Sequence, residues 1–346
     1  MSMSKLLITL GLILLMTTPF SVAYAADQPY SGSGTAVVSD AGAMSDSVTI
    51  SLSGLMALEK DMAYEGWLVD STSGDKVSVG ILSAAFGDIN HTWTSPDGAN
   101  LLALYDCVVI SVESMPDDDP AEWSEIAFLD TIDEGAIGEI RGLVVGDSST
   151  LYMLQMQVHM AMAKVAEAQA ADDIDALRAA TEEAVGMVDG DDGIAALAAS
   201  ASASAMAAMD ASSRDSVDMY AKRVMASSDN VSAWAMAAKE DAASVTAQED
   251  LEVAKTLLNI VNGKLSAAMN GVAVSDMGGA NDAYVSAQKM ATFMLPAPSG
   301  DAAVDTPKTG DAYVPMAMQV MLFVALMLLI GGGAMLYRER RLGSKA

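Results

Sequence analysis

Cysteine and histidine are nearly absent from this chain of 346 residues, which has one cysteine and two histidines. A single cysteine excludes a scaffold of internal disulfides. Few acid–base and nucleophile pairings are available, and there is no Gly-Lys-Ser/Thr phosphate loop, Gly-x-Ser-x-Gly motif or His-Glu-x-x-His motif. Carboxylate-pair hydrolysis stays open, but no spacing marks a pair. The sequence therefore predicts a protein that is not an enzyme and needs no cofactor.

Positive charge is also scarce. The chain has 18 Lys and Arg residues but 46 Asp and Glu residues, which gives a net charge of −28. Such a chain repels phosphate, so nucleic acid is excluded as a partner. The chain is nevertheless 52% hydrophobic, which is ample for a folded core. Part of that hydrophobicity lies at the two ends, whereas every acidic residue except Glu339 lies between them.

The first 25 residues have the three parts of a secretory signal peptide. Lys5 supplies the positive charge, residues 6–16 form the apolar segment, and Ala23 and Ala25 occupy the small-residue positions of a cleavage site. Signal peptidase is the expected partner, and the mature chain is expected to begin near Ala26. The alternative is an uncleaved membrane anchor.

A second apolar run, residues 314–337, carries no charge and exceeds the roughly 20 residues that a membrane-spanning helix needs. Basic residues follow it in the tail 338–346, which predicts a cytoplasmic tail and places the preceding body outside the membrane. The expected location is the extracellular side of the plasma membrane or the cell wall, with anchoring at the C-terminus.

The residues before this run are Thr306-Pro307-Lys308-Thr309-Gly310, within a Pro- and Gly-rich segment, 295–313, that has the composition of a stalk. Together with the apolar run and the basic tail, these residues resemble a sortase-type sorting signal. The positions that match the signal are Pro307, Thr309 and Gly310. Thr306 departs from it, since Leu is commonest there. The resemblance implies cleavage between Thr309 and Gly310 and transfer of Thr309 to a cell-envelope amine. The alternative is a plain membrane anchor.

After a linker at 26–34, residues 35–132 have the pattern of a small antiparallel β-sandwich. Short apolar runs, separated by Gly, Pro and Asp, recur about every ten residues. The expected strands include residues 48–52, 64–69, 77–82, 91–94, 101–105 and 107–112. We expect Trp67 and Trp93 in the sandwich core and Cys107 as a small buried side chain.

Several of these runs resemble the C-terminal domain of anti-sigma-K factors, an extracytoplasmic β-sandwich. The runs are Ser51-Leu52-Ser53-Gly54-Leu55, Tyr64-Glu65-Gly66-Trp67-Leu68, Val77-Ser78-Val79-Gly80 and Val109-Ile110-Ser111-Val112-Glu113. The resemblance covers about a quarter of the chain, and the segment 115–120 departs from it. Sigma-factor regulation would need a cytoplasmic binding segment, but the expected tail is short. The resemblance therefore implies a fold rather than that function.

Residues 133–294 are rich in Ala and Met, with no proline, and predict helices. Apolar stripes mark helices at 174–188, with Asp172 and Asp173 as caps, and at 251–261, with a capping box at 246–249 and a stop at Gly263. A further helix is expected over 281–294. Similarity between 162–190 and 236–263 suggests repeated antiparallel hairpins. The predicted fold class is α+β: a sandwich, a helical hairpin repeat region and one C-terminal transmembrane helix.

One group of side chains has the chemistry of a soft-metal site. Met156 and Met160 lie four residues apart, and His159 lies three residues after Met156, so adjacent turns of one helix would present thioethers and an imidazole, which suit Cu(I). Methionine also fills gaps in helical cores. Two acidic turns, at 117–119 and 189–193, offer oxygen ligands for Ca²⁺, although neither has the spacing of an EF-hand. The alternative is that both are turns exposed to solvent.

Three functions remain open from the sequence. The first is a non-catalytic surface protein for binding, adhesion or envelope structure, with an unidentified extracellular ligand. The second is an extracytoplasmic Cu(I)- or Ca²⁺-binding protein. The third is an anti-sigma-factor-like regulatory ectodomain.

Overall fold

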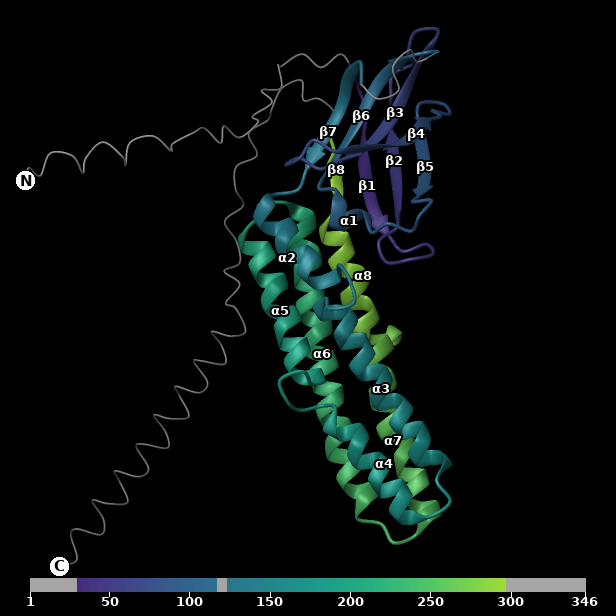
Figure 1. Cartoon of the computed structure of the whole chain (residues 1–346), viewed down its shortest axis with the longest axis vertical. Helices are drawn as coiled ribbons and strands as arrows, with labels where there is room; N and C mark the ends of the chain where they lie inside the picture. Colours follow the sequence, from purple (N-terminus) through teal and green to yellow (C-terminus); the bar gives the residue numbers. More distant parts are fainter. Residues whose placement is uncertain (1–29, 117–122, 297–346) are drawn as a thin grey trace, which may run out of the picture. The chain divides into compact units, whose positions relative to one another are not determined.

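The computed structural model describes residues 30–116 and 123–296. The chain divides into two compact units, 1–300 and 301–346, and every described residue belongs to the first. Within that part of the chain there are two antiparallel sheets and eight α-helices, as expected for an α+β fold (Figure 1). No helix among these residues is long and apolar enough to cross a membrane.

The two four-stranded sheets pack face to face. The first has the order β5-β2-β1-β8 and the second the order β4-β3-β6-β7, with every pairing antiparallel. The strands are β1 (Ser33–Ser39), β2 (Ser47–Ser53), β3 (Met62–Val69), β4 (Lys76–Leu82), β5 (Ile89–Thr94), β6 (Cys107–Ser114), β7 (Glu125–Thr131) and β8 (Phe293–Leu295). Five expected strands are thus confirmed, in β2 to β6.

Alternation along the strands explains the core between the sheets. Ile50 of β2, Leu68 of β3 and Ile110 of β6 are at most 1% exposed and belong to one cluster. Gly66 of β3 allows the sheets to approach, because a Cβ there would lie 2.6 Å from Cγ2 of Val79 and 3.0 Å from Cδ1 of Ile50. The alternation is clear in β2 and β5, whereas β3 and β6 are buried on both faces.

The expected strand at 101–105 is wrong. Residues Leu101–Leu104 form the short helix α1, and the Asn100 side chain caps it by accepting a hydrogen bond from the Ala103 amide at 3.1 Å. Leu and Ala favour a helical turn more than β-branched residues do, and Leu101 and Leu102 are buried there. A buried strand was expected over 101–105, but only its first two residues are buried, and the backbone is helical.

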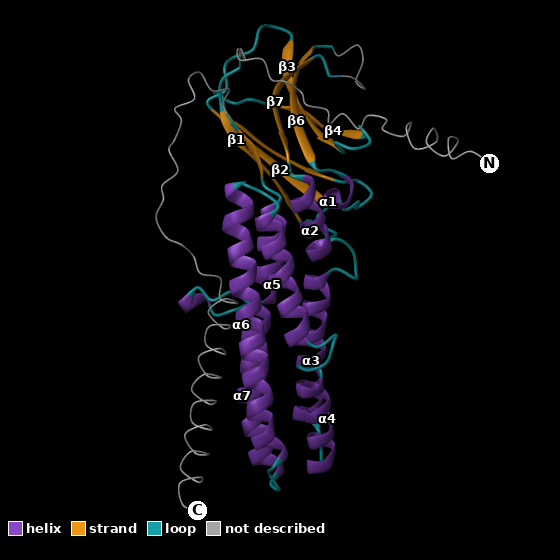
Figure 2. Cartoon of the chain, turned by 90° about the vertical axis from the view of Figure 1, so that its left-hand side faces the viewer, coloured by secondary structure: helices purple, strands orange, loops and turns teal. Residues whose placement is uncertain are grey.

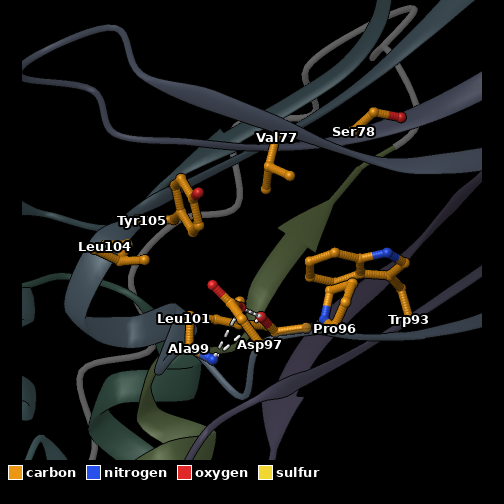
Figure 3. Close-up of a pocket in the computed structure, with 10 residues that line it drawn as sticks. Val77, Ser78, Trp93, Pro96, Asp97, Ala99, Leu101, Leu104 and Tyr105 are labelled. Carbon is orange, nitrogen blue, oxygen red and sulfur yellow. Dashed lines mark hydrogen bonds between the residues drawn. The ribbon is translucent and has the colours of Figure 1, made fainter.

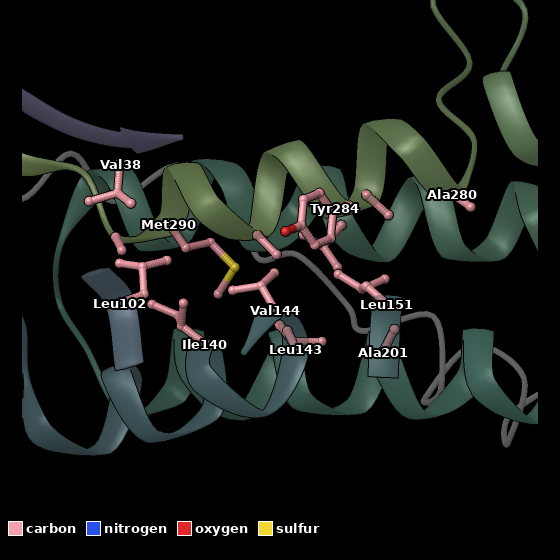
Figure 4. Close-up of a cluster of buried hydrophobic side chains, with 14 of the residues drawn as sticks. Val38, Leu102, Ile140, Leu143, Val144, Leu151, Ala201, Ala280, Tyr284 and Met290 are labelled. Carbon is pink, nitrogen blue, oxygen red and sulfur yellow. The ribbon is translucent and has the colours of Figure 1, made fainter. Parts of the chain in front are cut away.

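The remaining helices form four antiparallel columns (Figures 1 and 2). One column contains α2 (Glu134–Val144) and α3 (Thr150–Ala170), and the next contains α4 (Ile174–Gly186) and α5 (Ile194–Asp210). The third is the single long helix α6 (Asp215–Thr246). The fourth contains α7 (Leu251–Asn270), the 3₁₀ turn η1 (Ala273–Ser275) and α8 (Ala280–Met290). Adjacent columns contact one another along the bundle, and Figure 4 shows buried side chains of α2 and α8 together with neighbours from other elements of the same core.

Alanine at heptad spacing fills the centre of this bundle. Buried residues recur at alternating intervals of three and four, as in α6 at positions 217, 221, 224, 228, 231, 235, 238, 242 and 245. α3, α5 and α7 have the same spacing. This is the repeat of coiled-coil packing, and its small side chains allow the helices to approach closely.

Some expected helix boundaries need correction. Asp173 caps α4 as predicted, since its side chain accepts hydrogen bonds from the Asp175 and Ala176 amides. The capping box at 246–249 is wrong, because α6 runs to Thr246 and Asp250 caps α7. Gly263 is no stop: it lies exposed within α7, where packing outweighs the roughly 1 kcal/mol helix cost of glycine.

The two antiparallel hairpins exist, as α3–α4 and α6–α7, but not in the expected register. Residues 187–190 lie in the turn after α4, whereas their supposed equivalents, 260–263, lie inside α7. Evenly spaced apolar residues in an Ala-rich sequence align at several offsets, so a spacing match does not fix which turns correspond. The expected helix over 281–294 ends at Met290, and its last residues contribute to β8.

Arg214 joins the bundle to both sheets. Its guanidinium forms an ion pair with Asp130 of β7 and donates to the carbonyl oxygens of Thr131 and Thr292, at 3.0 and 3.1 Å. The same Asp130 carboxylate accepts from the amide of Met294 in β8 at 2.5 Å. A second link joins α8 to the β1–β2 turn, where Gln288 donates to Asp40. Sandwich and bundle therefore share one hydrogen-bonded junction.

Candidate binding cleft

The edge strands of the two sheets, β4 and β5, border an open cleft. Each pairs on one side only, β4 with β3 and β5 with β2. Along part of this border Nε2 of His91 lies 2.9 Å from the carbonyl oxygen of Val79, which links the two edges. Beyond that link the edges border a hollow of about 580 Å³.

Strand alternation positions the largest side chain of the cleft. Ile89, His91 and Trp93 share the inward face of β5: Ile89 is buried, His91 bridges to β4, and Trp93 is only half-buried. Trp93 lies opposite Val48 in the β2–β5 register. Its indole therefore packs on the end of the core and also faces the hollow.

The opposite wall comes from β4 and from the end of α1. Figure 3 shows Tyr105 and Trp93 on two sides of the hollow, with Val77 above and Asp97 between them. Leu101 forms a buried part of the lining, whereas Leu104 is exposed. The described residues of the lining are Val77, Ser78, Trp93, Ser95, Pro96, Asp97, Ala99, Leu101, Leu104 and Tyr105. They are mostly apolar and include two aromatic rings and one charged side chain.

Hydrogen bonds fix the turn that carries the charge. The Ser95 hydroxyl donates to Oδ1 of Asp97 and accepts from the Ala99 amide at 3.1 Å, and that amide also donates to Asp97 at 3.3 Å. The Ser95 hydroxyl and the amides hold the pKa of Asp97 below its usual value, so the carboxylate is charged near neutral pH.

The negative charge of Asp97 affects the pKa of the Tyr105 phenol. Burial raises its pKa above the usual value, and the carboxylates of Asp75 and Asp97 raise it further. Tyr105 is therefore a neutral phenol at physiological pH. The cleft thus combines aromatic walls with a negative potential from two carboxylates.

The suspected metal ligands lie elsewhere, on the exposed face of α3. Met156 and Met160 are 37% and 38% exposed and His159 is also exposed, so these methionines do not fill the helical core. Exposed methionines also occur on α6, at Met219 and Met236, so exposure alone does not single out this group. Copper binding by α3 stays a prediction.

The acidic turns have no metal-binding cluster in the described part of the chain. No group of three or more His, Cys, Asp or Glu side chains there is arranged to hold an ion. Asp189 of the turn at 189–193 pairs with Lys239 of α6. The turn at 117–119, like Ala23, Ala25, Pro307, Thr309 and Gly310, lies outside the described residues.

A second apolar cluster on the outer face of the β4-β3-β6-β7 sheet was missed. Trp67 is in this cluster rather than between the sheets, and its indole donates to the Ser111 hydroxyl at 2.9 Å. Trp123 packs edge-to-face against it, and Nζ of Lys76 lies 4.2 Å from the Trp123 ring centroid. Cys107 is buried here as expected, and burial raises the pKa of its thiol to about 11. It is an unreactive thiol at neutral pH.

Little in the sequence indicates the cleft. Trp93 was expected in the core, and nothing in the sequence singled out Asp97. One available signal was a tryptophan near the end of an alternating edge strand, separated by one residue from the Ser-Pro-Asp-Gly sequence of a turn. Comparison with known proteins finds no matching family model, no matching curated protein and no matching solved structure. The resemblance to anti-sigma-K factors therefore stays a prediction.

Proposed function

We propose that this chain is a non-catalytic binding protein held at the cell surface, with the cleft between β4 and β5 as its binding site. The observation that carries the proposal is the cleft itself: two aromatic rings and an oriented carboxylate in a largely apolar hollow. Concave, mostly apolar sites with a few fixed polar groups are typical of ligand binding.

The ends of the sequence support the surface location. A signal peptide ending at Ala25, the sorting signal around Thr309 and the apolar run 314–337 together imply export and C-terminal anchoring. The implied partners are signal peptidase, the membrane, and a sortase with a cell-envelope amine. The acidic body is compatible with that exterior location and again disfavours nucleic acid.

The cleft can be tested by NMR with simple probe molecules, one from each of three ligand classes. The sample is residues 26–300, which is the compact unit 1–300 without the expected signal peptide and which contains every described residue. The probes are tetramethylammonium chloride, glucose and sodium acetate, added separately. We expect at least one of them to shift the indole N–H signal of Trp93, which a Trp93→Phe variant identifies.

Two alanines provide a matched pair of variants for this test. Ala99 lines the cleft, whereas Ala103 is exposed on α1 and does not line it. Ala99→Trp should fill the hollow and abolish the shift, and Ala103→Trp should leave it unchanged. If none of the three probes moves the Trp93 signal, or if Ala99→Trp still responds, the cleft is not the binding site.

A further inference from the structure

The walls of the cleft are suited to one class of ligand. Trp93 and Tyr105 present aromatic rings on two sides of the same hollow (Figure 3). The face of an aromatic ring carries partial negative charge and attracts a cation within about 6 Å of its centroid. Two rings that line the same hollow can therefore each attract an ammonium group that enters it.

The charges around the cleft favour the same ligand. Asp97 is the one charged residue in the described lining, and Asp75 is near enough to act on the Tyr105 phenol. Among the residues that the structure describes, no basic side chain lines the hollow. Lys76, next to the lining residue Val77, extends to Trp67 and Trp123 on the other side of its sheet. No cation of the described chain therefore occupies the cleft.

Other ligand classes fit less well. A carboxylate or phosphate would be repelled by Asp97 and Asp75. A sugar needs several hydrogen-bonding groups, but the polar side chains of the lining are those of Ser78, Ser95, Trp93, Asp97 and Tyr105, and three of these already make hydrogen bonds. The Ser95 hydroxyl donates to Asp97, and the Ser78 hydroxyl donates to Glu65. An apolar, weakly hydrated cation uses the walls without requiring those hydrogen bonds.

We propose that the cleft binds an alkylammonium group, with Trp93 and Tyr105 enclosing its methylene or methyl groups and Asp97 balancing its charge. This inference rests on the proposed function of the cleft and adds the class of ligand. The cationic group enters between β4 and β5 at the open edge of the sandwich. Its remaining part extends outward past Pro96 and Leu104, which are both exposed.

The test compares choline with its uncharged isostere, 3,3-dimethylbutan-1-ol, by calorimetric titration of residues 26–300. The two molecules have the same shape and differ in charge. We expect choline to bind about tenfold more tightly, within the range expected of cation–π and charge attraction at a partly exposed site. Equal affinity for both molecules would refute the proposal, because apolar contact alone would then explain binding.

Two further variants separate charge from packing. Asp97→Asn keeps the shape of the turn and should weaken choline binding about fivefold, or roughly 1 kcal/mol, without affecting the isostere. Trp93→Leu keeps an apolar side chain, removes the ring and should weaken choline more than the isostere. Asp191→Asn, on the exposed turn between α4 and α5, is the charge-matched control and should change neither affinity.

The outcomes distinguish the proposed alkylammonium ligand from the proposal that the cleft is a binding site. If choline does not bind while glucose or acetate shifts Trp93, the cleft is a binding site for another class and only the alkylammonium assignment is wrong. If no probe binds, both proposals fail. If Asp97→Asn behaves like Asp191→Asn, the carboxylate has no part in recognition and the assignment is also wrong.

Discussion

At the scale of single residues, buried polar side chains determine the turns of the sandwich. Asp46 illustrates this between β1 and β2, where its carboxylate accepts hydrogen bonds from the amides of Ala41, Gly42 and Ala43 at 2.6, 3.0 and 2.8 Å. Burial acts to raise the pKa of Asp46, but the hydrogen bonds outweigh it and leave the pKa below its usual value.

The lowered pKa predicts how the stability contributed by Asp46 depends on pH. A carboxyl group with a lower pKa in the folded state stabilises fully above its unfolded-state pKa of about 3.9, and that contribution is lost as the pH falls through the folded value. In urea unfolding, Asp46→Asn should therefore destabilise the protein at pH 7, and its difference from wild type should shrink below pH 4. Asp191→Asn should show no such trend. A difference independent of pH would contradict this assignment.

The role of a single residue could be predicted from the sequence when its hydrogen-bond partners lie close to it in the chain. Asp173 was recognised as a cap because its partners, Asp175 and Ala176, lie within three residues. Asp97 and Trp93 were not recognised as a site, because which side chains of residues 93–105 face one hollow depends on how the turn after β5 and the helix α1 fold against the edge of β4. The sequence had predicted a strand where α1 lies, so this arrangement could not be foreseen.

At the scale of elements, the bundle depends on small side chains at its centre. Ala201 of α5 is fully buried at a heptad position, and Ala203 of the same helix is exposed. Since interiors are close-packed, extra methylene groups force the helices apart.

Leucine substitution at these two positions tests the heptad packing. Ala201→Leu should lower the free energy of unfolding by about 1–3 kcal/mol. Ala203→Leu should change it by less than about 0.5 kcal/mol, because surface substitutions in helices have small effects. Thermal or urea unfolding followed by circular dichroism measures both. Equal effects at the two positions would mean that α5 is not packed as described.

Strands were more predictable than helix boundaries, for a physical reason. Alternating burial in β2 and β5 produces a period of two that few other structures share. In the bundle, alanine occupies both buried and exposed positions, so hydrophobicity gives little contrast around each helix. The heptad spacing in α6 was present in the sequence, but alanine and serine occupy five of its nine positions, so the spacing is difficult to see against an Ala-rich background.

At the scale of the whole molecule, the proposed function depends on anchoring at the C-terminus. The sorting signal predicts that a transpeptidase joins Thr309 to the envelope, which would replace the apolar run 314–337 by a covalent bond. The wild-type protein should therefore resist extraction with detergent and be released by digestion of the cell wall.

A substitution in the signal tests this anchor. Thr309→Ala should remove the side chain that the signal requires at the cleavage site and leave a protein that detergent extracts with the membrane fraction, whereas Lys308→Ala, at the variable position, should behave as wild type. Fractionation followed by immunoblotting measures both. Complete extraction of the wild-type protein by detergent would show that the anchor is a retained membrane segment instead.

The placement of β8 has a mechanical consequence for such an anchored protein. The whole bundle lies between β7 and β8 in the chain, yet β8 pairs with β1 beside the first described residues, with Leu295 opposite Gly34. Tension between a ligand in the cleft and an anchor beyond Pro296 would pass across the β5-β2-β1-β8 sheet and bypass the bundle. The load would reach β8 first, so the lifetime of the tether under force would depend on the hydrogen bonds between this short strand and β1.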